Sequence, residues 1–143
     1  MELRRMQPED VKQVALIESQ TFSIPWSEEA FFDSLALPHT IFVVAEEQGE
    51  IAGYCGMYTS FQEGEIVNVA VAEKYRRQGV AGRMLEFLFF EGLKKEVSSF
   101  FLEVRESNTA AIGLYECFGF RQIGLRKNFY EKPREHALIM WKE

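Results

Sequence analysis

The segment from Arg76 to Gly82 combines basic and small residues where an expected strand gives way to a helix. It reads Arg-Arg-Gln-Gly-Val-Ala-Gly and follows the run Asn68 to Val71. The first N–H groups of a helix lack partners within it, and the helix dipole is positive there, so such a turn can cradle an anion. Glycine lets a phosphate approach the backbone closely. The pattern favours a pyrophosphate site flanked by Arg76, Arg77 or Arg83, and the alternative is a helix start that only needs a tight turn.

The other motifs and reactive side chains argue against several kinds of site. The turn has neither the Gly-x-Gly-x-x-Gly spacing of dinucleotide sites nor the Gly-Lys-Ser/Thr of P-loops. Cys55 and Cys117 have no histidine close in sequence, and each lies in an apolar segment where cysteine commonly packs, so a covalent cysteine mechanism is disfavoured. With His39 and His136 they show no zinc-type spacing, and we expect no metal.

Alternating strands and helices must position these residues. Hydrophobic periodicity and turn residues predict strands over 2–6, 41–46, 51–58, 65–71, 100–104, 120–126 and 137–141. Helices are expected to begin near Pro8, to follow the cap Ser27 over 28–36, to run from the glycine turn through Lys95, and to extend from the cap Asn108 to Gly119. Without a repeat or linker, the chain is predicted to be one α/β domain over residues 1–143.

Composition sets limits on the class of protein. A length of 143 residues with 47% hydrophobic content suits one soluble domain. The formal charge of -6 disfavours direct nucleic-acid binding. No apolar run approaches the roughly 20 residues that span a bilayer, and the first ten residues lack the apolar stretch of a secretory signal, so we expect a cytoplasmic protein without membrane contact. Residues 1–52 carry ten acidic and three basic residues, which fits solvated helices or attraction of a cationic partner.

Several segments together resemble the GNAT acetyltransferases, and among them the RimI type of ribosomal-protein alanine N-acetyltransferases. The acyl-CoA signature of that family is similar to Arg76-x-x-Gly79-x-Ala81 after Asn68 to Val71. The RimI type is similar over nearly the whole chain, through residues 22–27, 102–105, 108–111, 114–120, 126–130 and 135–140. One departure is Phe129, where a tyrosine is common, so a hydroxyl is missing there. The resemblance implies a mixed, twisted central sheet of GNAT type flanked by about four helices.

The resemblance also implies a set of acetyl-CoA contacts. Main-chain groups of Val69, Ala70 and Val71 would hold the pantetheine arm and the acetyl carbonyl, and Asn108 would touch the cofactor. The pyrophosphate would lie at the turn formed by Arg76, Arg77, Gln78, Gly79, Val80, Ala81 and Gly82. A strand edge offers N–H groups that can orient an amide-bearing arm and polarise a thioester carbonyl, while the valines otherwise read as buried strand residues.

Acetyl transfer to an amine needs a neutral amine, stabilisation of the developing oxyanion and a proton for the departing thiolate. By the resemblance, Glu103 is the base, acting through water, and Tyr115 is the acid that protonates the thiolate. From the residues alone, Glu103 could equally form an ion pair near Arg105 or face solvent, and Tyr115 could pack in the core. Direct attack by the amine in a ternary complex is preferred.

The acceptor is predicted to be the N-terminal alanine of a small-subunit ribosomal protein. Trp26 and Tyr130 would flank the peptide entrance, or else serve as ordinary aromatic packing. The acidic first part of the chain would face a cationic N-terminal tail, so that any link with the ribosome runs through protein. Alternatives are a GNAT enzyme that acetylates another protein N-terminus, a lysine or a small amine, and a non-catalytic partner subunit that keeps the acetyl-CoA site.

Overall fold

The computed structural model describes all residues 1–143 and has one seven-stranded mixed sheet at its centre. The strands lie in the order β1-β2-β3-β4-β5-β7-β6, and every pairing is antiparallel except β4 with β5. Their bounds are β1 Glu2–Arg5, β2 Thr40–Glu47, β3 Glu50–Ser60, β4 Glu63–Val71, β5 Ser99–Arg105, β6 Arg121–Tyr130 and β7 Glu135–Lys142. The expected mixed sheet is therefore confirmed, and each predicted strand is present within a few residues of its expected limits.

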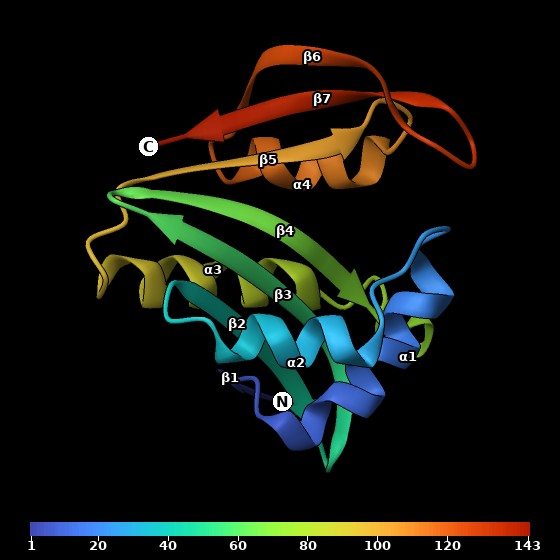
Figure 1. Cartoon of the computed structure of the whole chain (residues 1–143), viewed down its shortest axis with the longest axis vertical. Coiled ribbons are helices and arrows are strands. Elements are labelled where there is room, and N and C mark those ends of the chain that lie inside the picture. The colour runs from blue at the N-terminus through green and yellow to red at the C-terminus, as the bar shows by residue number, and fades with distance from the viewer.

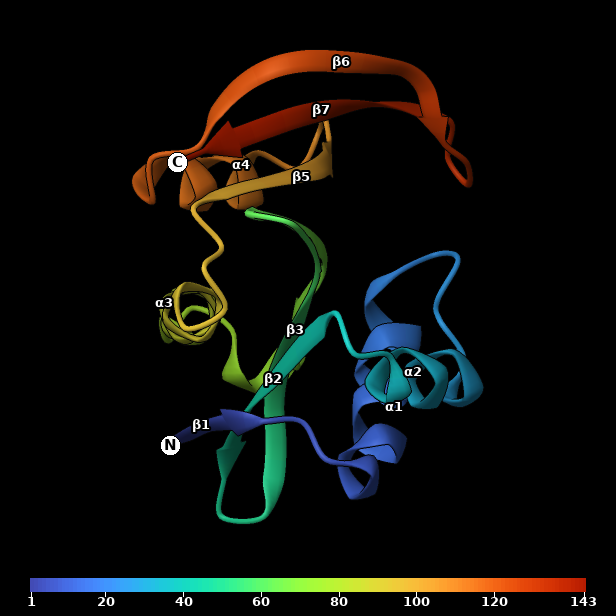
Figure 2. The ribbon, with the colours of Figure 1, turned by 60° about the vertical axis from the view of Figure 1, so that its left-hand side comes forward.

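Four α-helices cover the two faces of this sheet. They are α1 Val11–Thr21, α2 Glu28–Ala36, α3 Val80–Leu93 and α4 Thr109–Cys117, and short 3-10 turns occupy Pro8–Asp10 and Glu73–Tyr75. Figure 2 shows α3 on one side of β2 and β3, and α1 with α2 on the other side. Two buried apolar clusters match these layers, because one joins α3 and α4 to the sheet and the other joins α1 and α2 to its opposite face.

Local sequence signals explain most helix limits. Ser27 Oγ accepts a hydrogen bond from the N–H of Ala30 at 3.1 Å and caps α2 as expected. Asn108 Oδ1 accepts from Ala111 N–H at 3.2 Å and caps α4, and Gly119 with φ +94° follows that helix. The helix expected at Pro8 begins as a 3-10 turn and becomes α-helical only at Val11.

The sheet opens between its two parallel strands, and this opening positions the site. The β4–β5 ladder pairs Glu63 to Ile66 with Ser99 to Leu102, and beyond those residues the two strands no longer pair with each other. A register shift in the β3–β4 ladder also falls here, so that Val67 has no partner opposite it. Figure 1 shows β4 and β5 close together at one end and splayed apart towards the loop that follows α1.

Candidate active site

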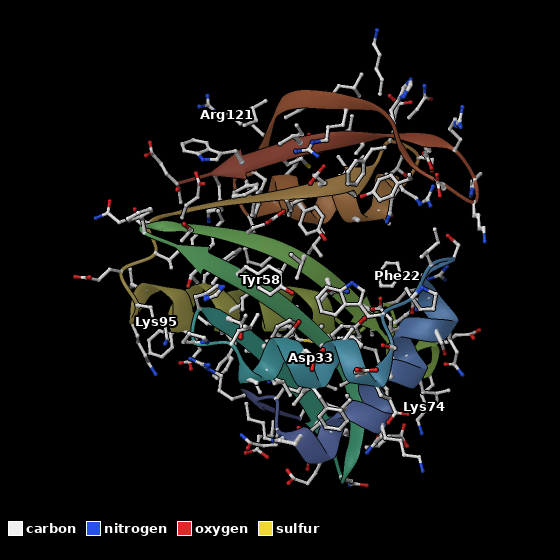
Figure 3. The ribbon with its side chains drawn as sticks, viewed as in Figure 1. Phe22, Asp33, Tyr58, Lys74, Lys95 and Arg121 are labelled. Carbon is white, nitrogen blue, oxygen red and sulfur yellow. The ribbon has the colours of Figure 1, made fainter.

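A cavity of about 1070 Å³ occupies the opening between β4 and β5. This volume is slightly above the range of about 300–1,000 Å³ found for small-molecule pockets. Its walls come from β4, β5, the first turn of α3, α4, the segment after α1 and the β6–β7 hairpin. Phe22, which lines the cavity, lies just after α1 beneath that hairpin (Figure 3). Residues far apart in sequence thus share one concave site.

One end of the cavity is built for an anion. Gly79 is the N-cap of α3 with φ +77°, a left-handed conformation that glycine adopts readily, and no side chain caps the helix. The N–H groups of Val80, Ala81 and Gly82 therefore remain available at the positive end of the helix dipole. All four residues line the cavity, so the turn fits the pyrophosphate of acetyl-CoA.

The cations of this turn have different orientations. Arg76 and Arg77 line the cavity, and Arg76 Nε donates to the carbonyl oxygen of Val71 at 3.0 Å. Gln78 lies outside the lining, and its Nε2 donates back to Lys74 O at 3.2 Å. Arg83 is also outside and reaches the carbonyl oxygen of Met1 at 3.5 Å. The structure thus leaves two of the three expected arginines beside the anion end.

The free edge of β4 offers main-chain groups to the same cavity. The N–H of Ala72 donates to Ala52 O on β3 at 2.8 Å. Because main-chain polar groups alternate between the two edges of a strand, those of Val71 and Val69 point to the opposite edge, where β5 has separated. Val69, Ala70 and Val71 all line the cavity. Val69 and Val71 can therefore present backbone donors and acceptors to an extended, amide-bearing ligand, whereas the main-chain groups of Ala70 point towards β3.

Glu103 faces the cavity from β5, and 17% of its side chain is exposed. Arg126 Nε on β6 lies 3.1 Å from Glu103 Oε2, but the two are not aligned for hydrogen bonding, and this buried oxygen has no hydrogen-bond partner. The ion pair expected as an alternative role does exist, with Arg126, whereas Arg105 pairs with Glu135 at 3.1 Å. Glu103 thus combines an ion pair with Arg126 and a carboxylate group that faces the cavity.

Tyr115 lies on α4 with only 7% of its surface exposed, and it too lines the cavity. Its ring packs against Phe120 at 5.7 Å between centroids, and its hydroxyl forms no hydrogen bond within the protein. Burial is the main cause that raises the pKa of the phenol, and the negative forms of Cys55 and Tyr130 add to it. At neutral pH the residue is therefore a protonated donor that faces the cavity from the core.

Asn108 lines the cavity at the start of α4. Its Oδ1 is engaged in the helix cap, which leaves the Nδ2 donor for a ligand.

Aromatic side chains form another part of the cavity wall. Trp26 and Tyr130 both line the cavity, and Trp26 packs on Phe31 at 5.2 Å. Burial, followed by the charge of Glu103, raises the pKa of Tyr130 to about 12, against a lowering by Arg105. The two aromatic residues named from sequence therefore stand at the same opening, and Trp26 also packs in the core.

Arg105 holds the hairpin that carries Tyr130. Its guanidinium donates to Pro133 O at 2.9 Å, Glu131 O at 3.0 Å and Glu135 Oε1 at 3.1 Å. It also lies 4.4 Å from the centre of the Tyr130 ring. One side chain thus fixes the tip of the hairpin and the aromatic wall together.

Three polar residues in or near the site were not predicted from the sequence. Glu18 and Asn68 are 2% and 6% exposed and line the cavity, and Asn68 Nδ2 lies 3.2 Å from Glu18 Oε1. The available signal was a carboxylate on the apolar stripe of α1, at helical spacing from Val14. The third is Glu65 on β4, whose pKa is raised by burial and then by the charge of Glu103, while Arg126 lowers it. No local pattern marked Glu65, because the neighbouring charge comes from another strand.

The remaining reactive groups lie elsewhere. Neither cysteine lines the cavity, and burial raises the pKa of the Cys55 thiol. No cluster of three or more His, Cys, Asp or Glu side chains suited to a metal ion is present. None of the helices combines the length and apolar character that crossing a membrane requires.

Known proteins are similar to this chain in sequence and in fold. The Acetyltransferase (GNAT) family profile matches residues 11–120. A putative [ribosomal protein bS18]-alanine N-acetyltransferase of Bacillus subtilis is 36% identical over 140 residues, which are 97% of this chain and 93% of that protein. The [ribosomal protein bS18]-alanine N-acetyltransferase of Escherichia coli K12 is 36% identical over 126 residues, 87% and 84% of the two chains. The crystal structure of the ribosomal-protein-S18-alanine N-acetyltransferase from E. coli superposes with a TM-score of 0.91 at 32% identity, covering 98% and 91%.

Proposed function

The chain belongs to the Acetyltransferase (GNAT) family, and from this membership we propose that it transfers the acetyl group of acetyl-CoA to the N-terminal alanine of ribosomal protein bS18. GNAT acetyltransferases use acetyl-CoA, so the donor follows from the family. The acceptor rests on relatives that are 36% identical over most of their length. The protein would act in the cytoplasm, where the ribosomal proteins of bacteria are made.

The observation that carries the proposal is a single cavity with an anion cradle at one end and a carboxylate, a buried phenol and an aromatic wall further along. Acetyl-CoA supplies a thioester carbonyl and a thiolate leaving group when bound. The α3 turn would hold its pyrophosphate, and the β4 edge at Val69 and Val71 would hold the pantetheine arm. The acetyl end would then reach the region lined by Glu103 and Tyr115, which is where the chemistry is required.

Glu103 would act as the base. An α-amino group has a pKa of about 7.7–8.0, so roughly a tenth of it is neutral at pH 7 and the rest must lose a proton. Glu103 lines the cavity, and its carboxylate would receive that proton, directly or through water. The neutral nitrogen then forms the C–N bond while main-chain N–H groups of β4 stabilise negative charge on the carbonyl oxygen.

Tyr115 would act as the acid. Cleavage of the C–S bond leaves a thiolate, and Tyr115 donates its phenolic proton to that sulfur. A thiol has a pKa of about 8.5 and a phenol about 10, so this proton moves in concert with bond cleavage. The nitrogen loses a second proton as the amide forms, and that proton, passed through water, would return to Tyr115, whose raised pKa favours the protonated phenol. No cysteine lines the cavity, which favours direct attack by the amine over an acetyl-cysteine intermediate.

A screen of N-terminal peptides with acetyl-CoA tests the proposal. We expect the peptide that reproduces the bS18 N-terminus to give the highest kcat/KM, with intact-mass analysis showing one acetyl group on the α-amine. A matched peptide with a blocked α-amine and an internal lysine is the control. Acetylation of that lysine or of small amines at comparable rates would move the assignment to another GNAT acceptor. Binding of acetyl-CoA without release of CoA for any amine would indicate a non-catalytic partner protein.

Salt provides a second test of the acceptor. Residues 1–52 carry the excess of acidic groups, and a basic N-terminal tail would be attracted to them. The KM for the peptide should then rise with ionic strength while the kcat remains steady. A peptide KM that is insensitive to salt contradicts this part of the proposal.

A further inference from the structure

A buried carboxylate without a cation lies beside the cavity. Glu18 on α1 is 2% exposed, and no Lys, Arg or His pairs with it. It accepts hydrogen bonds from the N–H of Trp26 at 3.0 Å, from Asn68 Nδ2 and from the hydroxyl of Tyr54. These donors reach both carboxylate oxygens and fix the side chain in one orientation. An ionisable group in an apolar layer is costly, so its presence calls for a physical reason.

The carboxylate determines how Asn68 is turned. An ionised carboxylate only accepts hydrogen bonds, so the amide must present its NH₂ group, and Nδ2 lies 3.2 and 3.4 Å from the two Glu18 oxygens. The carbonyl oxygen Oδ1 is thereby directed away from Glu18. It is buried and has no hydrogen-bond partner, although Asn68 lines the cavity. A preoriented acceptor is left for a donor that the protein itself does not supply.

The position of Asn68 favours the acceptor as the source of that donor. Ala70, two residues along β4, packs in the cluster of α1 and α2, whereas Val69 and Val71 pack towards α3. Asn68 therefore faces the α1 and α2 side, which also carries Trp26. The anion cradle at the start of α3 belongs to the opposite side of the sheet. A peptide that enters past Trp26 would meet Asn68, and Glu103 stands on the adjacent strand β5.

We propose that Asn68 binds the reacting amine of the acceptor through Oδ1, and that Glu18 is a positioning residue that holds the Asn68 amide in the required orientation. This inference rests on the proposed function. An amide carbonyl holds an N–H without removing its proton, so Asn68 orients the nitrogen while Glu103 takes the proton. Burial raises the pKa of Glu18 overall, and the hydrogen bonds from the Trp26 N–H and the Asn68 amide oppose this rise because they stabilise the ionised form. The buried carboxylate of Glu18 would thus serve to orient the Asn68 amide.

Steady-state kinetics with the alanine-initiated bS18 peptide test the inference. Asn68→Ala should lower kcat/KM for the peptide at least about 10-fold, because a hydrogen bond to a charged group is lost, and should leave the KM for acetyl-CoA within about twofold. Asn68→Ser keeps a donor near Glu18 without the carbonyl and should behave likewise. Glu18→Gln allows the Asn68 amide group to flip and should lower the peptide kcat/KM by a smaller factor. If each folded variant keeps kcat/KM for the peptide within about twofold, or if the acetyl-CoA KM changes equally, the inference is wrong.

Ser34→Ala is the matched control. Ser34 is also buried on the α1 and α2 side, bonds to the Tyr58 hydroxyl at 3.0 Å and does not line the cavity. Its loss should lower the melting temperature without changing the peptide kcat/KM. A loss of peptide kcat/KM in this variant comparable to that in Asn68→Ala would assign the effect to general destabilisation and overturn the inference.

An ester analogue of the peptide identifies the donor. Replacing the first peptide bond by an ester removes the N–H of the second residue and keeps the α-amine. The loss caused by Asn68→Ala should be the same for both peptides. If it disappears with the ester, Oδ1 binds the second residue's N–H, and the assignment to the amine is overturned. A wild-type protein that acetylates no N-terminal peptide would instead refute the proposed function, which separates the two failures.

Discussion

Replacing Tyr115 by phenylalanine removes one oxygen atom from the cavity and little else. The side chain is 7% exposed, its ring packs against Phe120, and its hydroxyl bonds to no protein group. Because this hydroxyl forms no hydrogen bond within the protein, its removal breaks none, and the free energy of unfolding should be nearly unchanged. The acetyl-CoA contacts proposed for α3 and β4 do not involve this oxygen. The variant should therefore fold and bind acetyl-CoA with a Kd within about twofold of the wild type.

The effect on turnover should be large by comparison. General acid catalysis contributes typically about 10²–10⁴-fold to a rate. A phenol, with an ordinary pKa of about 10, is a weak acid at neutral pH, which places the contribution of Tyr115 towards the lower end of that range. We expect kcat to fall about 100-fold, or about 2.7 kcal/mol in activation free energy at 1.36 kcal/mol per factor of ten. The loss should be uniform across neutral pH because the phenol does not ionise there.

A single-turnover experiment measures this effect without interference from product release. Enzyme in excess over acetyl-CoA is mixed with saturating peptide, and the CoA thiol is trapped as it forms. Tyr58→Phe is the control, since Tyr58 lies outside the main cavity and bonds to Ser34 at 3.0 Å. That variant should lose roughly 1 kcal/mol of stability and keep its rate, the reverse of Tyr115→Phe. Equal single-turnover rates for Tyr115→Phe and the wild type would remove Tyr115 from the mechanism.

Three further outcomes follow from the geometry. Gly79→Ala places a residue with a Cβ in the left-handed N-cap conformation, at a cost of about 1–2 kcal/mol. The substitution should raise the KM for acetyl-CoA more than the KM for the peptide. An unchanged acetyl-CoA KM would count against the α3 turn as the pyrophosphate site. A lysine at position 105 cannot reproduce the three hydrogen bonds that Arg105 donates to the hairpin. Arg105→Lys should therefore raise the peptide KM about 10-fold and increase hydrogen exchange at Glu131. Unaltered exchange would show that the hairpin is ordered without Arg105. Burial acts to raise the pKa of Asp10, but the hydrogen bond and charge of Arg4 lower it overall, so Asp10 contributes stability above about pH 4 that is lost as pH falls further. Urea unfolding between pH 2 and 6 should therefore show a steeper acid loss for the wild type than for Asp10→Asn, and parallel curves would contradict this.

Much of the architecture could be predicted from the sequence, because local rules determine it. The Ser27 and Asn108 caps, the glycine that begins α3 and the alternation in β4 each act within a few residues. The limits were less certain where pairing decides them. Strand β6 was expected to end at Arg126 but continues to Tyr130, after a register shift against β7, since the partner strand sets how far the ladder extends.

The site divides in the same way. The sequence by itself indicated the family and predicted an anion-binding turn from Arg76 to Gly82 and two candidate catalytic residues, because the resemblance that carries these predictions rests on short contiguous segments of the chain. Tertiary structure alone decided that Arg83 and Gln78 turn away, that Glu103 meets Arg126, and that Glu18 orients Asn68 across 50 positions. Most of these contacts join elements that are distant in sequence, such as α1 with β4 and β5 with β6, and they form only when the sheet and its helices assemble. Their energies depend on burial, which no local pattern encodes.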